Sequence, residues 1–512
     1  MRTENPYNTF DIPTQYQDFK RFKESTTNIR QQMEQMQNLE EYLEPWYNMS
    51  RENGSAYPSQ GLLRTENDYL DYRLTPNGDA ETVMLSKQEI IETLSTQLEF
   101  LSLFNHPYRI YHLLKKDKEE FCPPPELESD LFKVASSEYI SLAIGDIAAT
   151  VHWAPKERVS RSEREGQGPF IKLGRQARSL FIGSESPDTW SSSVAVAVMA
   201  ASHCLAAIPR NGVLQDLERQ AAFARDVFKW LDHYADLILT DRPDREIITQ
   251  MWKNNVMGTL EASPDKALRR ADLLMEAGVR SFRPYSPEPG MGPVTTTYEL
   301  RKRYGNEIEI IAGQIVSVEQ AQMVEQAGAE GIVVGIGGGG RCITGSRSGL
   351  PIDWPELVWN LRGKIGIPII VQGGASDHIP ETLLLGASGI GVSRIVAGGT
   401  IESPGGALFY VDSQGRKFKT YGGEASARNK RVEGKLKFGR LASFVEGETT
   451  KAFLNFIDGA VPTLTYNLDQ LNENAILGLV FRSVESVEEL HAINPSPLKR
   501  LTEQSDRQRR TH

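Results

Sequence analysis

The stretch "IEIIAGQIVSVEQAQMVEQAGAEGIVVGIG", residues 308–337, contains one complete strand–helix–strand unit. Residues 308–316 and 331–337 are short and almost continuously apolar, a pattern typical of strands that are buried on both faces of a parallel sheet. Between them, residues 317–328 carry apolar side chains at helical spacing and end at a glycine. Parallel strands joined by a helix require a right-handed crossover. The stretch therefore predicts an α/β fold.

The same alternation continues on both sides, from about residue 179 to residue 396. It gives nine candidate strands, of which residues 237–241 fit the pattern least well: 179–186, 204–209, 237–241, 255–261, 279–286, 308–316, 331–337, 368–374 and 389–396. Such a series predicts parallel strands covered by helices. We assign residues 131–490 to a (β/α)8 TIM barrel, whose active site lies at the C-terminal ends of the strands. A doubly wound open sheet is the alternative.

The segments that flank the barrel have a different character. Residues 1–130 are polar and carry helical patterns, including a capping box at Ser86 and Glu89 that predicts the start of a helix. The proline-rich residues 122–130 mark a boundary. We therefore expect an N-terminal, mainly helical extension of unknown role over residues 1–130, and a polar, basic tail over residues 491–512.

Composition excludes several classes of protein. The net charge of −10 argues against a general nucleic-acid binder. No apolar run approaches the roughly 18 residues of a membrane span, and the first residues lack the apolar core of a signal peptide. Cys122, Cys204 and Cys342 lie far apart, which argues against a disulfide framework or a zinc site. We expect a cytoplasmic protein with neither nucleic-acid nor membrane partners.

Glycine-rich turns follow three successive candidate strands. They are residues 337–340, residues 373–374, and residues 397–406, which contain "AGGT" and "ESPGG". Glycine lets the backbone approach a ligand closely and direct N–H groups at an anion. Late loops of a barrel often form a phosphate site. The turns indicate such a site, and tight turning of the chain alone is the alternative.

Cys342 ends the first of these loops, in "GIGGGGRCITG". A thiol at the catalytic face of a barrel can act as a nucleophile if its surroundings favour the thiolate. Thr344, two residues later, is placed to donate or relay a proton. The alternative is that Cys342 is a small buried apolar residue.

The residues around Cys342 resemble the catalytic loop of the IMP dehydrogenase / GMP reductase family. The resemblance covers about residues 137–490 and keeps the order and spacing of the family's motifs. It rests on "AGAEGIVVGIGGGGRCITG" (327–345), "GIPIIVQGG" (366–374), "LLLGASGIGVSRIVAGGTIESPGG" (383–406), "GRKFKTYGGEAS" (415–426) and "VEGKLKF" (432–438). The pair of regulatory CBS domains inserted in most IMP dehydrogenases is missing, which brings the chain closer to GMP reductase.

The resemblance implies that Cys342 attacks C2 of a purine nucleotide while a nicotinamide cofactor, NADP or NAD, exchanges a hydride. It implies a small-molecule nucleotide substrate and a homo-oligomer, by family resemblance a tetramer. The catalytic residues carried over are Cys342, Thr344 and Glu424. Those carried over for the substrate are Ser184, Gln314, Gly339, Gly340, Gln372, Gly373, Gly374, Ser393, Arg394, Tyr421 and Ser426. Tyr285 and Ser286 stand at the cofactor position, and Gly337, Gly339 and Cys342 match a site for a monovalent cation such as K+.

Several functional positions depart from the family. Gln372 replaces the acid that binds the ribose hydroxyls, Gly340 replaces a phosphate-binding serine, and Tyr285 replaces an aspartate near the cofactor ribose. Only "ARNKR" separates Ser426 from "VEG", where the dehydrogenases carry a long flap that activates water. We therefore expect reductive, GMP-reductase-like chemistry on a non-standard nucleotide in specialised metabolism. A catalytically silent barrel that acts as a scaffold, and thiol chemistry on another substrate without nicotinamide, are the alternatives.

Overall fold

The structure is a computed structural model. The structure describes residues 17–22, 28–51, 81–128, 160–286, 288, 290–335, 342–349, 354–374, 376, 378–412, 414–439, 441–453 and 460–495.

Eight parallel strands close into a barrel in the order β10-β11-β4-β5-β6-β7-β8-β9. They are β4 (Phe181–Gly183), β5 (Leu205–Ile208), β6 (Val256–Glu261), β7 (Ser281–Tyr285), β8 (Glu309–Ile315), β9 (Gly331–Val334), β10 (Ile369–Gln372) and β11 (Gly389–Val392). The pairing of β11 with β4 closes the ring. The predicted (β/α)8 barrel is confirmed, and the open sheet is excluded.

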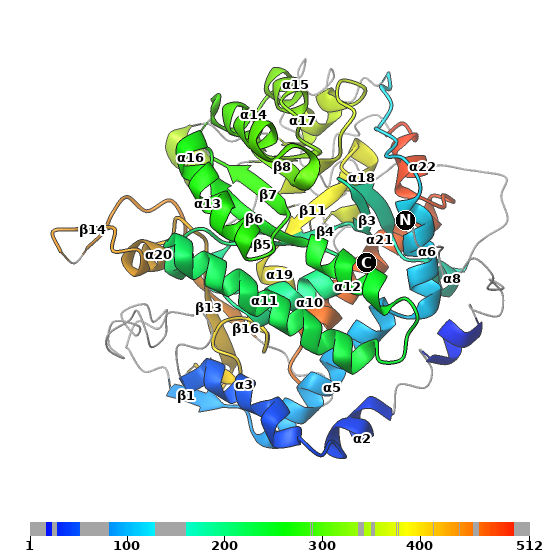
Figure 1. The fold of residues 1–512 in the computed structure, drawn as a ribbon, viewed down its shortest axis with the longest axis vertical. Coiled ribbons are helices and arrows are strands. Elements are labelled where there is room, and N and C mark those ends of the chain that lie inside the picture. The colour runs from blue at the N-terminus through cyan, green and yellow to red at the C-terminus, as the bar shows by residue number, and fades with distance from the viewer. Residues whose placement is uncertain are drawn as a thin grey trace, which may run out of the picture.

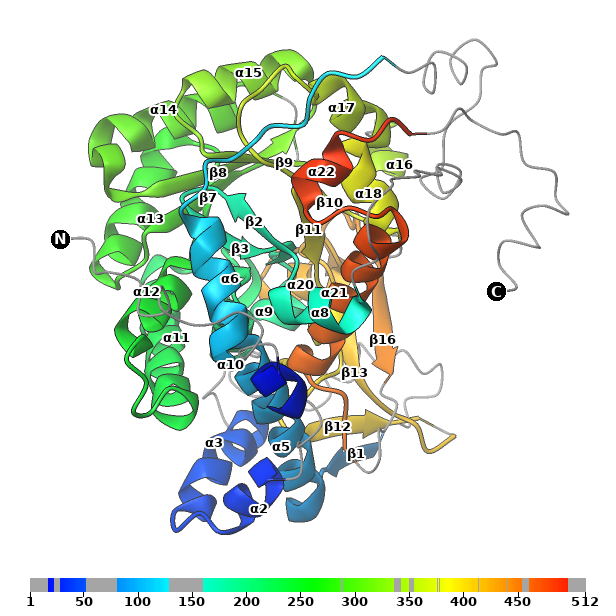
Figure 2. The same ribbon diagram turned by 90° about the vertical axis from the view of Figure 1, so that its right-hand side faces the viewer.

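Helices surround the strands, as Figures 1 and 2 show. Their apolar faces pack against the barrel wall and, with the buried strands, form one continuous core. They are α10 (Ser193–Ala201), α11 (Leu217–Ile238), α12 (Arg245–Asn254), α13 (Pro264–Glu276), α14 (Gly292–Tyr304), α15 (Val318–Gln326), α17 (Trp354–Leu361), α18 (Ile379–Leu385) and α19 (Arg394–Ala397). No helix in the described parts of the chain is long and apolar enough to cross a membrane.

The prediction of a strand at residues 237–241 is wrong. Residues 237 and 238 are the last two residues of α11, and the other three form the bend and turn that follow it. Val227, Leu231, Tyr234 and Ala235 are buried at helical spacing in α11. The apolar residues at 237–238 continue this helical face rather than beginning a strand.

The β2–β3 hairpin lies at the N-terminal end of the barrel strands. It consists of β2 (Phe170–Leu173) and β3 (Gln176–Ser179) and follows α8 (Arg161–Gln167). Arg178 forms a buried ion pair with Glu309, the first residue of β8, at 2.8 Å. The same side chain donates to Asn255 Oδ1, just before β6, at 2.8 Å. These contacts fix the hairpin at the end of the barrel opposite the predicted site.

A second, antiparallel sheet pairs one strand that precedes the barrel with three strands that follow it. Its order is β1-β12-β13-β16, formed by β1 (Glu81–Met84), β12 (Leu408–Val411), β13 (Lys417–Gly422) and β16 (Thr449–Phe453). Lys419 of β13 is buried and donates to the carbonyl oxygens of Thr400, Ser403 and Gly406 at 2.7–3.1 Å. These bonds fix the sheet to the loop that follows α19.

Most of the described N-terminal segment is helical. It contains α2 (Asn28–Glu34), α3 (Leu39–Arg51), α5 (Lys87–Phe104) and α6 (Pro107–Asp117). The capping box at Ser86 and Glu89 is present at the start of α5. Gln97 of α5 donates to Glu402 at 2.8 Å, and α5 also packs against α21 (Leu464–Phe481). This segment therefore covers part of the barrel domain.

Candidate functional site

The residues proposed for the site lie at one rim of the barrel. Because all eight strands run in the same direction, their C-terminal ends meet at this rim. Nine of them come from the ends of five strands or from the loops directly after them. They are Ser184 after β4, Tyr285 and Ser286 at the end of β7, Gln314 in β8, Gln372, Gly373 and Gly374 at the end of β10, and Ser393 and Arg394 after β11.

Cys342 lies in the loop after β9, and its side chain is exposed. Its thiol donates a hydrogen bond to Oγ1 of Thr344, with a sulfur–oxygen distance of 3.3 Å. Thr344 begins the short helix α16 (Thr344–Ser348). The two predicted catalytic residues on this loop are therefore in direct contact, and the thiol is open to a ligand.

A short chain segment, residues 443–448, connects Cys342 to the turn that carries Glu424. The backbone of Gly447 pairs with both Cys342 and Ser426. The preceding residue, Glu446, also bonds to both parts: Ile343 N donates to Glu446 O at 2.8 Å, and Glu446 N donates to Ala425 O at 3.0 Å. Backbone hydrogen bonds therefore hold the loop of the nucleophile beside the turn at residues 423–426.

The carboxyl group of Glu424 lies among charged groups. Arg210 Nη2 is 4.0 Å from its Oε1, and 31% of the Glu424 side chain is exposed. Burial of the carboxyl group raises its pKa, and the charge of Glu433 adds to this, while Arg210 opposes it. A carboxyl group with a raised pKa keeps its proton closer to neutral pH, as a general acid requires.

Tyr285, at the end of β7, lies against two guanidinium groups. The Cζ atoms of Arg283 and Arg210 are 5.0 Å and 5.3 Å from the centre of its ring. Burial raises the pKa of Tyr285, with further contributions from Glu424 and Cys342. The nucleophile, the acid and this tyrosine thus share one electrostatic environment.

A cluster of four polar side chains occupies the rim beside Tyr285. Arg283 of β7 forms an ion pair with Glu185, and its Nη2 donates to Gln372 Oε1 at 2.7 Å. Gln372 Nε2 donates to Glu185 Oε2 at 3.4 Å, and Gln314 Nε2 donates to Gln372 Oε1 at 3.4 Å. We refer to Glu185, Arg283, Gln314 and Gln372 as the polar cluster.

Sequence reasoning missed Arg210, Glu185 and Arg283. A signal was present for each of them. Arg210 and Glu185 follow the ends of β5 and β4 by two residues, and Arg283 interrupts the otherwise apolar strand "SFRPY". A charged residue in a strand buried on both faces must find a buried partner or a ligand.

The turn after β10 contains two glycines in a left-handed backbone conformation. Gly373 and Gly374 have φ values of 106° and 75°, which an L side chain rarely adopts. Ser393 donates from Oγ to Thr189 Oγ1 at 3.3 Å, and Arg394 is exposed beside it. The turn that would bind a phosphate is therefore built from small residues with one exposed arginine at its edge.

The remaining predicted residues divide into three groups. Ser426 is buried, and its hydroxyl accepts from Asn429 Nδ2 at 3.2 Å, so it is held within the turn. Tyr421 is half-buried on β13, and Ser286 Oγ accepts from Glu288 N at 3.2 Å. Gly337, Gly339 and Gly340 lie outside the described residues, so the predicted cation site has only Cys342 placed.

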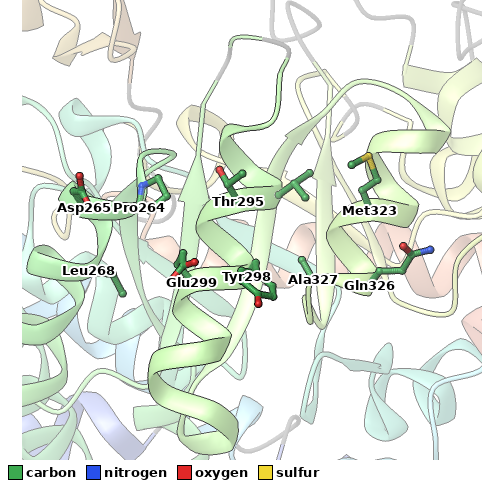
Figure 3. Close-up of a pocket in the computed structure, with 10 residues that line it drawn as sticks. Pro264, Asp265, Leu268, Thr295, Tyr298, Glu299, Met323, Gln326 and Ala327 are labelled. Carbon is green, nitrogen blue, oxygen red and sulfur yellow. The ribbon is translucent and has the colours of Figure 1, made fainter.

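A separate cavity of about 600 Å³ lies outside the barrel wall, between α13, α14 and α15. Figure 3 shows Leu268, Tyr298 and Met323 among the side chains that line it. It contains none of the residues proposed for catalysis. The proposed catalytic residues therefore lie at the rim and not in this cavity.

Comparison with known proteins agrees with the fold. The model of the IMP dehydrogenase / GMP reductase domain matches residues 29–512. The chain belongs to this family. The match begins inside residues 1–130, the predicted N-terminal extension.

Individual relatives match shorter parts of the chain. Inosine-5'-monophosphate dehydrogenase of Helicobacter pylori (strain ATCC 700392 / 26695) is 34% identical over 164 residues, which are 31% of this chain and 33% of the relative. Inosine-5'-monophosphate dehydrogenase 1 of Arabidopsis thaliana is 36% identical over 132 residues, 25% of each chain. The enzyme of Chlorobaculum parvum (strain DSM 263 / NCIMB 8327) is 31% identical over 232 residues, 44% of this chain and 46% of the relative. The chain thus spans a quarter to just under half of these curated relatives.

Proposed function

We propose that the protein is an oxidoreductase that acts on a purine-like nucleotide through a covalent adduct at Cys342, in the reductive, GMP-reductase-like direction. The observation that carries this proposal is the contact between an exposed thiol and Thr344 at the C-terminal rim of the barrel. Membership of the family supports the class of substrate. The 3.3 Å contact supports a nucleophile whose proton has an acceptor.

In this reaction, Cys342 Sγ bonds to C2 of the purine ring, and the 2-amino group leaves as ammonia with the proton of the thiol. Thr344 Oγ1 is the first acceptor of that proton. Glu424, whose pKa is raised by burial, is the acid beside the leaving group. The carbon–sulfur bond then breaks, sulfur leaves as the thiolate, and the thiolate takes up one proton from water, which restores the thiol.

The hydride that replaces sulfur at C2 would come from a reduced nicotinamide cofactor, NADPH or NADH, when one is bound. One feature near Tyr285 and Ser286 fits its carboxamide group: the Nε of Arg210 is buried and makes no hydrogen bond among the described residues. A nicotinamide carboxamide oxygen is a suitable acceptor for that donor. Position 285 offers no carboxylate, so the cofactor ribose must be bound without the acid used elsewhere in the family.

Other parts of the proposal rest on the family rather than on contacts of the single chain. They are a homo-oligomer, by resemblance a tetramer, a monovalent cation such as K+ at the loop of Cys342, and a cytoplasmic location. Specialised metabolism is proposed because Gln372 and Tyr285 differ from the residues that the family uses to bind its usual substrate and cofactor.

The direct test is turnover. The purified chain is incubated with GMP or other purine monophosphates and with NADPH or NADH, and loss of the reduced cofactor is followed by absorbance. We expect nucleotide-dependent oxidation that falls at least about a thousandfold in Cys342→Ala, because the covalent route is lost.

Cys122→Ala, which removes another exposed cysteine, is the matched control and should keep the wild-type rate. If no purine nucleotide supports oxidation by the wild-type chain, the reductase proposal fails. Equal rates for Cys342→Ala and the wild type would exclude the covalent step at Cys342 but would leave the reductase proposal standing.

A further inference from the structure

The polar cluster places opposite charges and amides at the centre of the rim. Glu185 follows β4, Arg283 lies on β7, Gln314 on β8 and Gln372 at the end of β10. Arg283 is 1% exposed, Glu185 6% and Gln314 5%. Four side chains from the ends of four strands therefore converge at the rim of the barrel, and three of them are buried.

This arrangement is costly if it serves stability alone. Removing two charges from water is expensive, and apolar side chains of the same volume often stabilise a fold as well or better. The cluster has one positive and one negative charge, so it is neutral as a whole. It therefore suits a neutral ligand group that is rich in hydrogen bonds better than a phosphate.

The cluster also keeps hydrogen-bonding capacity that the described residues do not use. Gln314 Oε1 and Arg283 Nε are both withdrawn from solvent and make no hydrogen bond within the described parts of the chain. Among the described residues, the hydrogen bond recorded for Glu185 Oε2 is the 3.4 Å contact from Gln372 Nε2. A buried donor and two buried acceptors thus lie together, and buried polar groups are normally satisfied.

The amide of Gln372 is poorly placed to bind a ligand by itself. Its oxygen already accepts from Arg283 at 2.7 Å and from Gln314 at 3.4 Å. The carboxylate of Glu185 lies 3.4 Å from the same amide. A carboxylate is therefore present next to residue 372, although it comes from the loop after β4.

We propose that Glu185, oriented by Arg283, is the acceptor that binds the sugar hydroxyls of the nucleotide and so makes the site specific for a ribosyl group. A ribose diol offers paired donors and acceptors, which match the carboxylate of Glu185 and the free atoms of Gln314 and Arg283. This assignment rests on the proposed function, because it takes the ligand to be a nucleotide.

The test compares the binding of GMP and 2'-deoxy-GMP by isothermal titration calorimetry, with the full-length wild type and with Glu185→Gln. The wild type should bind GMP at least about tenfold more tightly than the deoxynucleotide, since a hydrogen bond to a charged group is lost. In Glu185→Gln this ratio should fall to about one, because GMP loses the bonds of both sugar hydroxyls to the carboxylate and the deoxynucleotide loses only that of its 3'-hydroxyl.

Two further variants separate binding from folding. Glu309→Gln breaks the equally buried Arg178–Glu309 pair at the opposite end of the barrel and should keep the ratio of the wild type. Glu185→Gln with Arg283→Met removes both charges of the cluster, avoids an unpaired buried arginine, and should also give a ratio of about one.

The outcomes distinguish the two proposals. If the wild type binds GMP but Glu185→Gln and the double variant keep the discrimination, or if the wild type shows none, the role of Glu185 is overturned and the proposed function stands. If the wild type binds neither GMP nor any other purine monophosphate, both are overturned.

Discussion

At the scale of the residue, Glu424 is the group whose chemistry depends most on its surroundings. A glutamate in a loop is ordinarily ionised at neutral pH. Here burial and the charge of Glu433 raise its pKa, and Arg210 limits the effect. The protonated form therefore persists to a higher pH than in a free side chain, which gives it a proton to donate.

This raised pKa predicts the pH dependence of turnover. If the protonated carboxyl group of Glu424 is required, kcat should fall as the pH rises through its pKa. Glu424→Gln should lower kcat by roughly a hundredfold and remove that limb of the profile. The measurement is a pH–rate profile of both proteins.

A second variant tests the origin of the limb. Glu433→Gln removes a charge that raises the pKa of Glu424, so the limb should move to lower pH. A limb that keeps its position and slope in Glu424→Gln would show that another group is responsible.

Individual site residues differ in how far sequence could predict them. Cys342 and Thr344 could be placed because a residue after a barrel strand must lie at the rim. The roles of Glu185 and Arg283 could not, because their partners are 98 and 89 residues distant along the chain. Such pairs depend on which side chains face each other across the barrel, and a single sequence does not contain that geometry.

At the scale of the element, the decisive feature is the segment at residues 443–448. It follows the exposed hairpin of β14 (Leu436–Lys437) and β15 (Leu441–Ala442) and returns between the loop of Cys342 and the turn of Glu424. The sequence shows directly that only "ARNKR" separates Ser426 from "VEG". It gave no indication that the chain beyond "VEG" returns to the site.

Gly447 is the point at which this segment is most tightly packed. A Cβ atom there would lie 3.2 Å from the backbone nitrogen of Ser426 and 3.4 Å from the carbonyl carbon of Ala425. Gly447→Ala should therefore separate the turn from Cys342 and lower kcat by about tenfold or more. The measurement is steady-state turnover together with the melting temperature.

Gly423→Ala is the matched control on the neighbouring turn, since a Cβ atom there meets no atom within 4 Å. It should keep kcat within about twofold of the wild type. The role of the segment is contradicted if Gly447→Ala is as active as Gly423→Ala, or if its loss of activity only follows a loss of folded protein.

The strand wrongly predicted at residues 237–241 shows a limit at the same scale. A short apolar run fits a buried strand and the end of a long helix equally well. Only the helical spacing of the buried residues in α11 decides between them. The other eight strands could be predicted because each is bounded by a turn and by a complete helix.

At the scale of the whole molecule, buried histidines couple folding to pH. The pKa values of His106, His112 and His491 are lowered to about 4, and that of His203 to about 3, with burial as the largest cause in each. His106 caps α6, His112 lies on α6, His203 lies beside β3, and His491 ends α22 (Val487–His491). All four are held neutral in the folded state.

These shifts predict loss of stability in acid. A histidine with a lowered pKa contributes stability that is present above its unfolded pKa of about 6.5 and is lost as the pH falls towards its folded value. Each one can contribute up to about 1.4 kcal/mol per pH unit. The urea midpoint of unfolding should therefore be lower at pH 5 than at pH 7 at constant ionic strength, and equal midpoints would contradict the prediction.

The central claim, that Cys342 lies in the nucleotide site, is tested most directly by the rate of alkylation of each cysteine. The native chain is treated with iodoacetamide, with and without purine monophosphates, and peptides are quantified by mass spectrometry. Cys122 is exposed outside the rim and Cys204 is buried, so they serve as internal controls. We predict that a nucleotide slows alkylation of Cys342 at least about tenfold, leaves Cys122 unchanged, and that Cys204 stays unmodified. Alkylation of Cys342 at the same rate with every purine nucleotide would contradict the account.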